Sequence, residues 1–171
     1  MWDWRARMIS KMASTNLWRA PRLALLLPAC LLCLSAQISG VLSVAPPAKV
    51  FAKPGGKVDA KISVLLASGY HTNSNTPSEA YLIPLRLTWT PGPLEAVDVV
   101  FPKPHLEQYS FSPKPLSVFT GDFELITKFK IAANAPAGPG VAIGKLRYQA
   151  CNSNACLPPK TLEVRLPYQI Q

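Results

Sequence analysis

Short runs in which apolar and polar residues alternate are the feature that most limits what this chain can fold into. Alternation with a period of two is typical of a β-strand that has one face in a core. In residues 122–133, the odd positions from Phe123 to Ile131 are apolar or Thr127, while charged residues such as Glu124, Lys128 and Lys130 occupy even positions. Similar runs cover residues 49–53, 57–67, 79–90, 95–101, 141–151 and 161–170. The pattern predicts seven or eight strands.

Proline and glycine separate these runs. The chain has 18 prolines in 171 residues, about twice the usual share, which disfavours long helices. Pro84 interrupts the run 79–90 and indicates an edge strand or a bulge there. Residues 102–121 are rich in proline and aromatic residues and predict a long loop. We therefore expect a single antiparallel β-sandwich of the immunoglobulin type, although strand spacing alone does not distinguish it from other sandwiches.

The N-terminal segment predicts export. A basic stretch ends at Arg22, an apolar run covers Leu23–Leu34, and small and polar residues follow. This is the order of a secretory signal peptide. We assign residues 1–40 to it and residues 41–171 to the folded domain, located in the periplasm or another oxidising compartment. The alternative is an uncleaved anchor through residues 23–44, which a proline and several polar residues make a poor spanning helix.

The charge of the chain disfavours nucleic acid as a partner. The formal net charge is +9, but residues 41–171 hold 13 basic and 8 acidic residues, which leaves +5. The basic residues stand singly along the strands, without the basic clusters that bind phosphate backbones. We expect a monomer that binds no nucleic acid.

Few residues offer catalytic chemistry. The sequence has no serine–histidine–aspartate motif at a recognisable turn, no glycine-rich phosphate loop and no paired carboxylates. A zinc site from Cys151, Cys156, His71 and His105 is disfavoured because structural zinc sites use closer-spaced ligand pairs. We expect neither a metal nor a cofactor.

The pair Cys151 and Cys156 remains. The other two cysteines, Cys30 and Cys33, lie in the apolar leader. In an exported protein such a pair predicts a disulfide, but so short a ring stabilises a fold by only about 2 kcal/mol. The small residues 152–154 leave the sulfurs accessible to an attacking thiolate. The residues alone leave two functions open: a redox-active pair, or a structural bridge in a non-catalytic binding module.

Two segments resemble one known family. The stretch "LRYQACNSNACLPPKTLEVRL" resembles the active-site hairpin of the N-terminal periplasmic domain of DsbD-type thiol:disulfide interchange proteins. The stretch "SGYHTNSNTPSEAYLIPLRLTW" is similar to an upstream segment of that family. The resemblance covers about residues 48–168. It implies an immunoglobulin-like domain that passes electrons between exported thioredoxin-like proteins through Cys151 and Cys156, as a protein-disulfide reductase or interchange component.

The same resemblance implies an aromatic residue that shields the cysteines. In the corresponding loop, residues 102–121, the candidates are Tyr109, Phe111 and Phe119, of which Phe111 is favoured. For Phe119, packing in the core is the preferred interpretation.

Tyr70 and His71 fall in an aromatic turn that the family places near the site. A histidine there could tune thiolate formation, whereas Tyr70 is better explained by packing.

The sequence departs from the family in two respects. Its cysteines have four residues between them instead of five, and it ends at Gln171, before the membrane and thioredoxin-like domains of full-length members. Two alternatives follow: a separate donor, for which a membrane electron-transfer protein is a candidate, or another function on the same scaffold.

Overall fold

The computed structural model describes residues 40–171, and all the strands lie within these residues. The predicted signal peptide or anchor and its two cysteines lie outside the described residues. The strands are β1 (Leu42–Val44), β2 (Val50–Ala52), β3 (Lys57–Leu66), β4 (His71–Asn73), β5 (Arg86–Trp89), β6 (Leu94–Val100), β7 (His105–Glu107), β8 (Leu116–Thr120), β9 (Phe123–Ile131), β10 (Gly138–Tyr148), β11 (Ala150–Cys151) and β12 (Lys160–Ile170).

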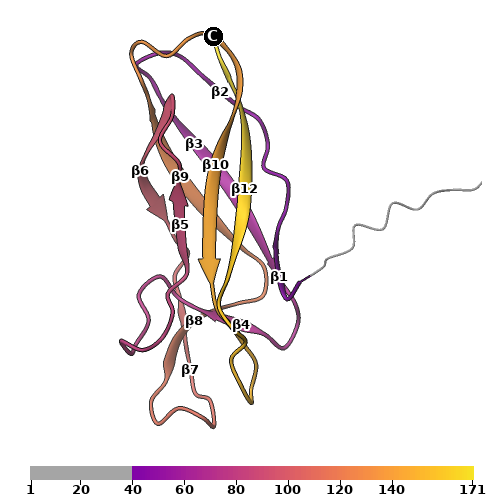
Figure 1. Ribbon diagram of the computed structural model, residues 1–171. Coiled ribbons are helices and arrows are strands. Elements are labelled where there is room, and N and C mark those ends of the chain that lie inside the picture. The colour runs from indigo at the N-terminus through magenta and orange to yellow at the C-terminus, as the bar shows by residue number, and fades with distance from the viewer. Residues whose placement is uncertain (1–39) are drawn as a thin grey trace, which may run out of the picture. The chain divides into compact units, whose positions relative to one another are not determined.

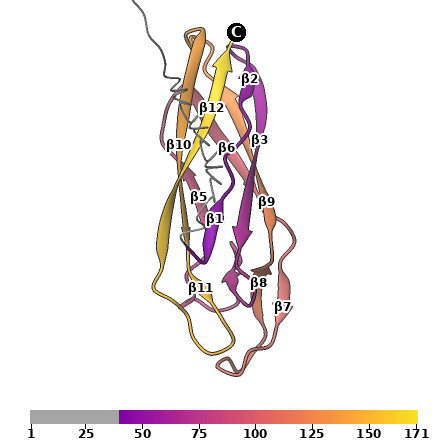
Figure 2. The ribbon, with the colours of Figure 1, turned by 90° about the vertical axis from the view of Figure 1, so that its right-hand side faces the viewer.

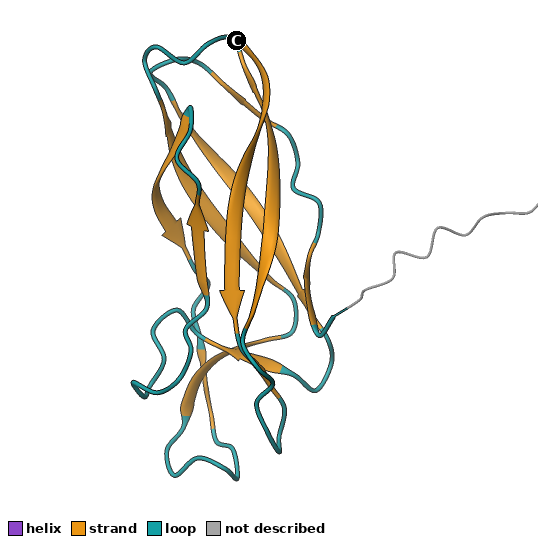
Figure 3. Cartoon of the chain, viewed as in Figure 1, coloured by secondary structure: helices purple, strands orange, loops and turns teal. Residues whose placement is uncertain are grey.

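The strands form three four-stranded sheets (Figure 1). Two long sheets, ordered β1-β3-β9-β6 and β2-β12-β10-β5, form the immunoglobulin-like sandwich that the sequence predicted. Every pairing is antiparallel except that of β2 with β12, which is parallel. Residues 40–171 consist of strands and loops (Figure 3). This described part of the chain therefore includes no helix that is long and apolar enough to cross a membrane.

The alternating residues of the two sheets form the main core. Ile62 and Leu125 from one sheet pack with Leu146 from the other, and all three are fully buried. In β9 the alternate positions from Leu125 to Ile131 are buried and the lysines are exposed, as the alternation predicts. The polar Thr127 fits this core because its Oγ1 accepts a hydrogen bond of 3.0 Å from the indole N–H of Trp89.

Two predicted element boundaries are wrong. The run 79–90 forms a strand only from Arg86 to Trp89, and Tyr81, expected on the buried face, is 70% exposed. Pro84 cannot donate to a strand ladder, and residues 74–85 instead form an irregular segment. The segment 102–121, expected to be a loop, contains β7 and β8. Four of the five residues of β8 are buried, so it shows no alternation.

The third sheet, ordered β11-β4-β8-β7, lies at one end of the sandwich (Figure 2). Strand β11 begins two residues after β10 ends, and it pairs with β4 instead of continuing along β12. The end of the β10–β12 hairpin therefore joins a different sheet from its two strands. The pairing of β11 with β4 places Cys151 opposite His71.

Candidate functional site

The cysteines lie in the connection between β10 and β12, here called the cysteine loop (residues 149–159). The β10–β12 ladder ends with Tyr148 opposite Lys160. Cys151 and Cys156 form a disulfide, with their Cα atoms 3.9 Å apart. The loop between them turns tightly because Asn152 Oδ1 accepts backbone N–H bonds of 2.9 Å from the second and third residues after it.

The two sulfur-bearing residues differ in accessibility. Cys151 is 1% exposed, whereas Cys156 is an exposed residue of the loop. Cys151 is buried because β11 is paired with β4, and Cys156 is exposed because the chain turns outward at Asn152. A reactant from solvent therefore reaches the disulfide at Cys156.

A row of three residues crosses the third sheet next to the disulfide. Cys151 stands opposite His71, and His71 stands opposite Thr120 on its other side. Residues directly opposite in an antiparallel ladder point to the same face of the sheet. His71 is 2% exposed, and its Nε2 has no hydrogen-bond partner among the described residues.

An aromatic stack covers this row. The Tyr109 ring lies parallel to the His71 ring, with centroids 4.0 Å apart, and Phe111 stacks on the Tyr109 ring at 5.4 Å. Phe111 is 41% exposed, so it forms the outer layer of the stack. The Tyr109 hydroxyl donates a hydrogen bond of 2.6 Å to Glu107 Oε2.

Burial sets the protonation states in this stack. It lowers the pKa of His71 from its ordinary value, and the negative charge of Glu107 opposes that shift only in part. Burial raises the pKa of Tyr109, and the hydrogen bond to Glu107 raises it further. At neutral pH the site thus holds a neutral imidazole beside a protonated phenol.

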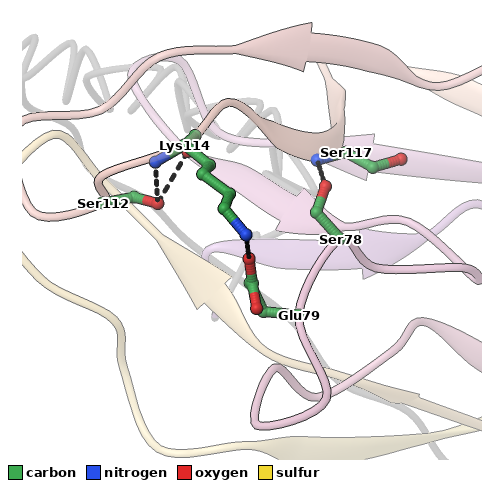
Figure 4. A network of polar contacts seen from close by, with 5 residues as sticks. All are labelled: Ser78, Glu79, Ser112, Lys114 and Ser117. Carbon is green, nitrogen blue, oxygen red and sulfur yellow. Dashed lines mark hydrogen bonds and ion pairs between the residues drawn. The ribbon is translucent and has the colours of Figure 1, made fainter.

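The aromatic loop (residues 108–115) carries Tyr109 and Phe111 and is held firmly at its base. Lys114 Nζ lies 3.3 Å from Glu79 Oε1, and Ser112 Oγ donates a hydrogen bond of 2.7 Å to the Lys114 carbonyl (Figure 4). The ion pair ties the loop to the segment that precedes β5.

One hydrogen bond of the described residues joins the aromatic loop to the cysteine loop. Ser110 Oγ donates to the Ser153 carbonyl at 3.4 Å, and the bond is exposed. An exposed bond of this length is weak. The aromatic loop is therefore joined to the cysteine loop by this one weak bond, and to the segment before β5 by the ion pair of Lys114 with Glu79.

A groove of about 530 Å³ opens beside the stack. Its lining includes Tyr70, His71, Glu107, Tyr109, Asp122 and Ser153. The groove runs from the aromatic loop to the cysteine loop, and two of these side chains are carboxylates. Ser153 is the residue of the cysteine loop that lines this depression.

The structure brings some of the predicted site residues together and separates others. His71 stands opposite Cys151, Tyr109 stacks on His71, and Phe111 stacks on Tyr109. Tyr70 is partly buried against the main core.

Phe119 is 2% exposed and packs between Phe101 and Phe123, as the preferred core interpretation has it. His105 is exposed on β7, and residues 40–171 contain no group of three or more His, Cys, Asp or Glu side chains placed to hold a metal. Glu107 was missed, because an isolated glutamate in a segment that predicts a loop carries no signal of its own.

One family model matches most of the chain. The family model for the N-terminal part of the thiol:disulfide interchange protein DsbD matches residues 41–167. No curated protein matches the chain.

Three solved structures illustrate the similarity of the fold. The N-terminal periplasmic domain of ScsB from Proteus mirabilis is 17% identical, with a TM-score of 0.49 over 73% of this chain and 44% of that chain. The N-terminal domain of Neisseria meningitidis DsbD in the reduced form is 19% identical, with a TM-score of 0.45 over 75% and 90% of the two chains. The seventh ScaB type I cohesin from Pseudobacteroides cellulosolvens is 15% identical, with a TM-score of 0.42 over 76% and 92%. The chain thus spans less than half the length of the ScsB chain.

Proposed function

This chain belongs to the family of DsbD N-terminal domains, and on that premise we propose that it carries out thiol–disulfide exchange through Cys151 and Cys156. Its partners are thioredoxin-like proteins of the periplasm or another exported compartment, between which it passes electrons. The observation that carries this proposal is the unequal burial of the two cysteines: a single exposed Cys156 is bonded to a buried Cys151.

The unequal burial assigns an order to the exchange. A donor thiolate attacks Cys156 Sγ, forms a mixed disulfide with it, and displaces Cys151 as the leaving sulfur. A second donor thiol then attacks the mixed disulfide, which leaves the donor oxidised and the domain with two thiols. In the reverse direction, the Cys156 thiolate attacks an acceptor disulfide and Cys151 resolves the product. Two electrons pass from the donor to the domain in the first reaction and from the domain to the acceptor in the second. No cofactor takes part.

The aromatic loop is assigned a shielding role on the basis of its position. Tyr109 covers His71 next to the buried cysteine, and Phe111 covers Tyr109. A partner that docks at Cys156 would replace the weak bond between Ser110 and Ser153 and enter the groove beside it. Tyr70 lines the same groove and would contact the partner there.

Trapping experiments test the central proposal. In a full chain that also carries Cys30→Ser and Cys33→Ser, Cys151→Ala leaves the exposed Cys156 free to hold a mixed disulfide with a thioredoxin-like protein. Cys156→Ala leaves only a buried thiol and should trap much less. Equal trapping by the two variants would contradict the assigned order.

Equilibration with glutathione buffers separates the proposal from a structural bridge in a binding module. A reduction potential below about −300 mV is the range of structural disulfides and would contradict an exchange function. A higher potential, together with trapping at Cys156, supports it.

The shielding role has its own test. Phe111→Ala should increase the rate at which dithiothreitol reduces the disulfide, because it removes the outer layer of the stack. Leu106→Ala is the matched control, since Leu106 is also exposed, at 74%, on the adjoining strand β7. An unchanged rate in Phe111→Ala would remove the shielding role from this residue.

A further inference from the structure

His71 and Cys151 are cross-strand neighbours, and both residues are buried. The two residues stand directly opposite in the β4–β11 ladder and are 2% and 1% exposed. Directly opposite residues of an antiparallel pair have Cβ atoms about 4.5–5.5 Å apart on the same face. A thiol at Cys151 therefore lies within reach of the imidazole whenever the disulfide is open.

His71 carries an unpaired ring nitrogen. Its buried Nε2 has no hydrogen-bond partner among the described residues, an arrangement that costs about 1–3 kcal/mol. Most buried polar atoms are paired, so an exception calls for an explanation. Reduction of the disulfide supplies a partner, because a thiol is a weak donor.

Cys151 has the complementary requirement. The thiolate is the form that attacks a disulfide, but burial disfavours the charged form of a thiol. Cys151 must nevertheless lose its proton to resolve a mixed disulfide held at Cys156. A neutral base next to its sulfur removes this difficulty.

The groups around His71 keep it neutral. Tyr109 stacks on its ring, and Thr120 stands opposite it on β8. Glu107 and Asp122 are the charged side chains that line the same groove, but the Tyr109 hydroxyl donates to Glu107 and the Leu66 N–H donates to Asp122. Burial outweighs the charge of Glu107 and lowers the pKa of His71.

We propose that His71 accepts the proton of the Cys151 thiol when the reduced domain closes its disulfide, an inference that rests on the proposed exchange function. In this step Cys151 Sγ attacks Cys156 Sγ of the mixed disulfide, the Cys151–Cys156 bond forms, and the bond from Cys156 to the partner breaks. The partner sulfur leaves with the electron pair, and the proton from Cys151 passes to His71 and then to solvent or the leaving thiolate. In the reverse direction the imidazole takes a proton from the attacking thiol or from solvent and delivers it to Cys151 as that sulfur leaves.

A two-step thiol titration followed by stopped flow tests this assignment. The reduced full chain with Cys30→Ser and Cys33→Ser is mixed with the aromatic disulfide DTNB. Attack by Cys156 releases the first coloured thiolate, and resolution by Cys151 releases the second. His71→Asn removes the base, and His71→Phe also removes it but keeps a ring to stack on Tyr109. His105→Asn is the control, because His105 is the other histidine of the chain and is exposed on β7.

The expected result is selective for the second step. Both His71 variants should keep the rate of the first release and slow the second by about 100-fold, the lower end of what a positioned base contributes. The control should change neither rate. In the unaltered site the second rate should fall at acidic pH as His71 becomes protonated, with its inflection below the ordinary histidine pKa of 6.5.

Other outcomes overturn the assignment. A second release as fast in both His71 variants as in the parent would exclude His71 as the acceptor and leave the exchange function intact. If the His71 variants do not fold, the pH dependence of the protein with His71 intact provides the test. A rate of second release that rises tenfold per pH unit from about pH 5 to pH 9, with no acidic inflection, excludes a histidine base. Absence of the first release in the parent would instead remove the proposed exchange function, and this inference with it.

Discussion

Reduction of the disulfide should leave the domain folded and only slightly less stable. The bond closes a ring of six residues, from Cys151 to Cys156. The chain-entropy estimate for a ring of this size is about 2 kcal/mol. A domain of this length has a free energy of unfolding of about 5–15 kcal/mol, so most of its stability does not depend on the bridge.

Hydrogen bonds that do not involve sulfur support this expectation. The Leu157 N–H donates to the Ala150 carbonyl at 2.8 Å, and the Asn152 N–H donates to the Ala155 carbonyl at 2.9 Å. Gln149 Nε2 donates to the Leu157 carbonyl at 3.1 Å. These bonds keep the cysteine loop close to its turn after the sulfurs separate, which makes 2 kcal/mol an upper value for the loss.

Thermal unfolding of the oxidised and the dithiothreitol-reduced chain measures this difference. With the leader cysteines replaced by serine, reduction should lower Tm by about 5–10 °C, the shift expected for about 2 kcal/mol in a domain of this size. By the same thermodynamic cycle, the folded chain should hold its disulfide about 40 mV below the potential of the urea-unfolded chain. A reduced chain that is unfolded at 25 °C, or that loses more than about 5 kcal/mol, would refute the reasoning and make the bridge structural.

Three further predictions concern the scaffold and its dependence on pH. Gly140→Ala should destabilise the fold by about 1–3 kcal/mol in urea unfolding, because the added Cβ would overlap the ring of Tyr168, which stands opposite it in the ladder. Thr127→Val should cost about 1–3 kcal/mol in the same assay, because the indole N–H of Trp89 loses its acceptor. The folded state lowers the pKa of His71, so below pH 6.5 the unfolded chain binds more protons. Stability from this residue is therefore complete above pH 6.5 and is lost as the pH falls toward the folded pKa, as unfolding at a series of pH values will measure.

Matched controls accompany these three predictions. Gly92→Ala should change the free energy of unfolding by less than about 0.5 kcal/mol, because no atom lies within 4 Å of the added Cβ. Thr88→Val removes an exposed hydroxyl from β5 and should also have little effect. His105→Asn should retain the acid-dependent loss of stability. If either core substitution were as mild as its control, or if His71→Asn kept the acid dependence, the corresponding contact would not have the energetic role assigned to it.

The long strands with one exposed face could be predicted from the sequence, whereas β8, which is covered on both faces, could not. The runs 57–67 and 122–133 alternate because one side of each strand meets solvent, and their strands were placed within one or two residues. Strand β8 lies between the main core and the cluster beneath Tyr109, so its side chains are buried on both faces. A strand buried in this way loses the period of two that identifies it.

The site could be predicted only in part for a different reason. The sequence places Cys151 and Cys156 in one loop, but the pairing of Cys151 with His71 joins residues 80 positions apart. Cys151 stands opposite His71 because β11 turns away from the direction of β10. No local sequence pattern predicts this turn. The order of Tyr109 and Phe111 in the stack likewise depends on the turn of the aromatic loop, in which the Ser112 N–H donates to the Tyr109 carbonyl.

The third sheet separates the chemistry of the site from the stability of the sandwich. Its inner face contributes Phe119 and Ala150 to the main core, while its outer face carries His71 and Cys151. The outer face is covered by Tyr109, which packs on a small cluster of Leu82, Leu116 and Val118 that is distinct from the main core. Displacement of the aromatic loop would therefore break one aromatic stack and the edge of this small cluster, and leave the contacts between the two long sheets in place. Under the proposed exchange function, the aromatic loop would move away from the site while the sandwich stays folded.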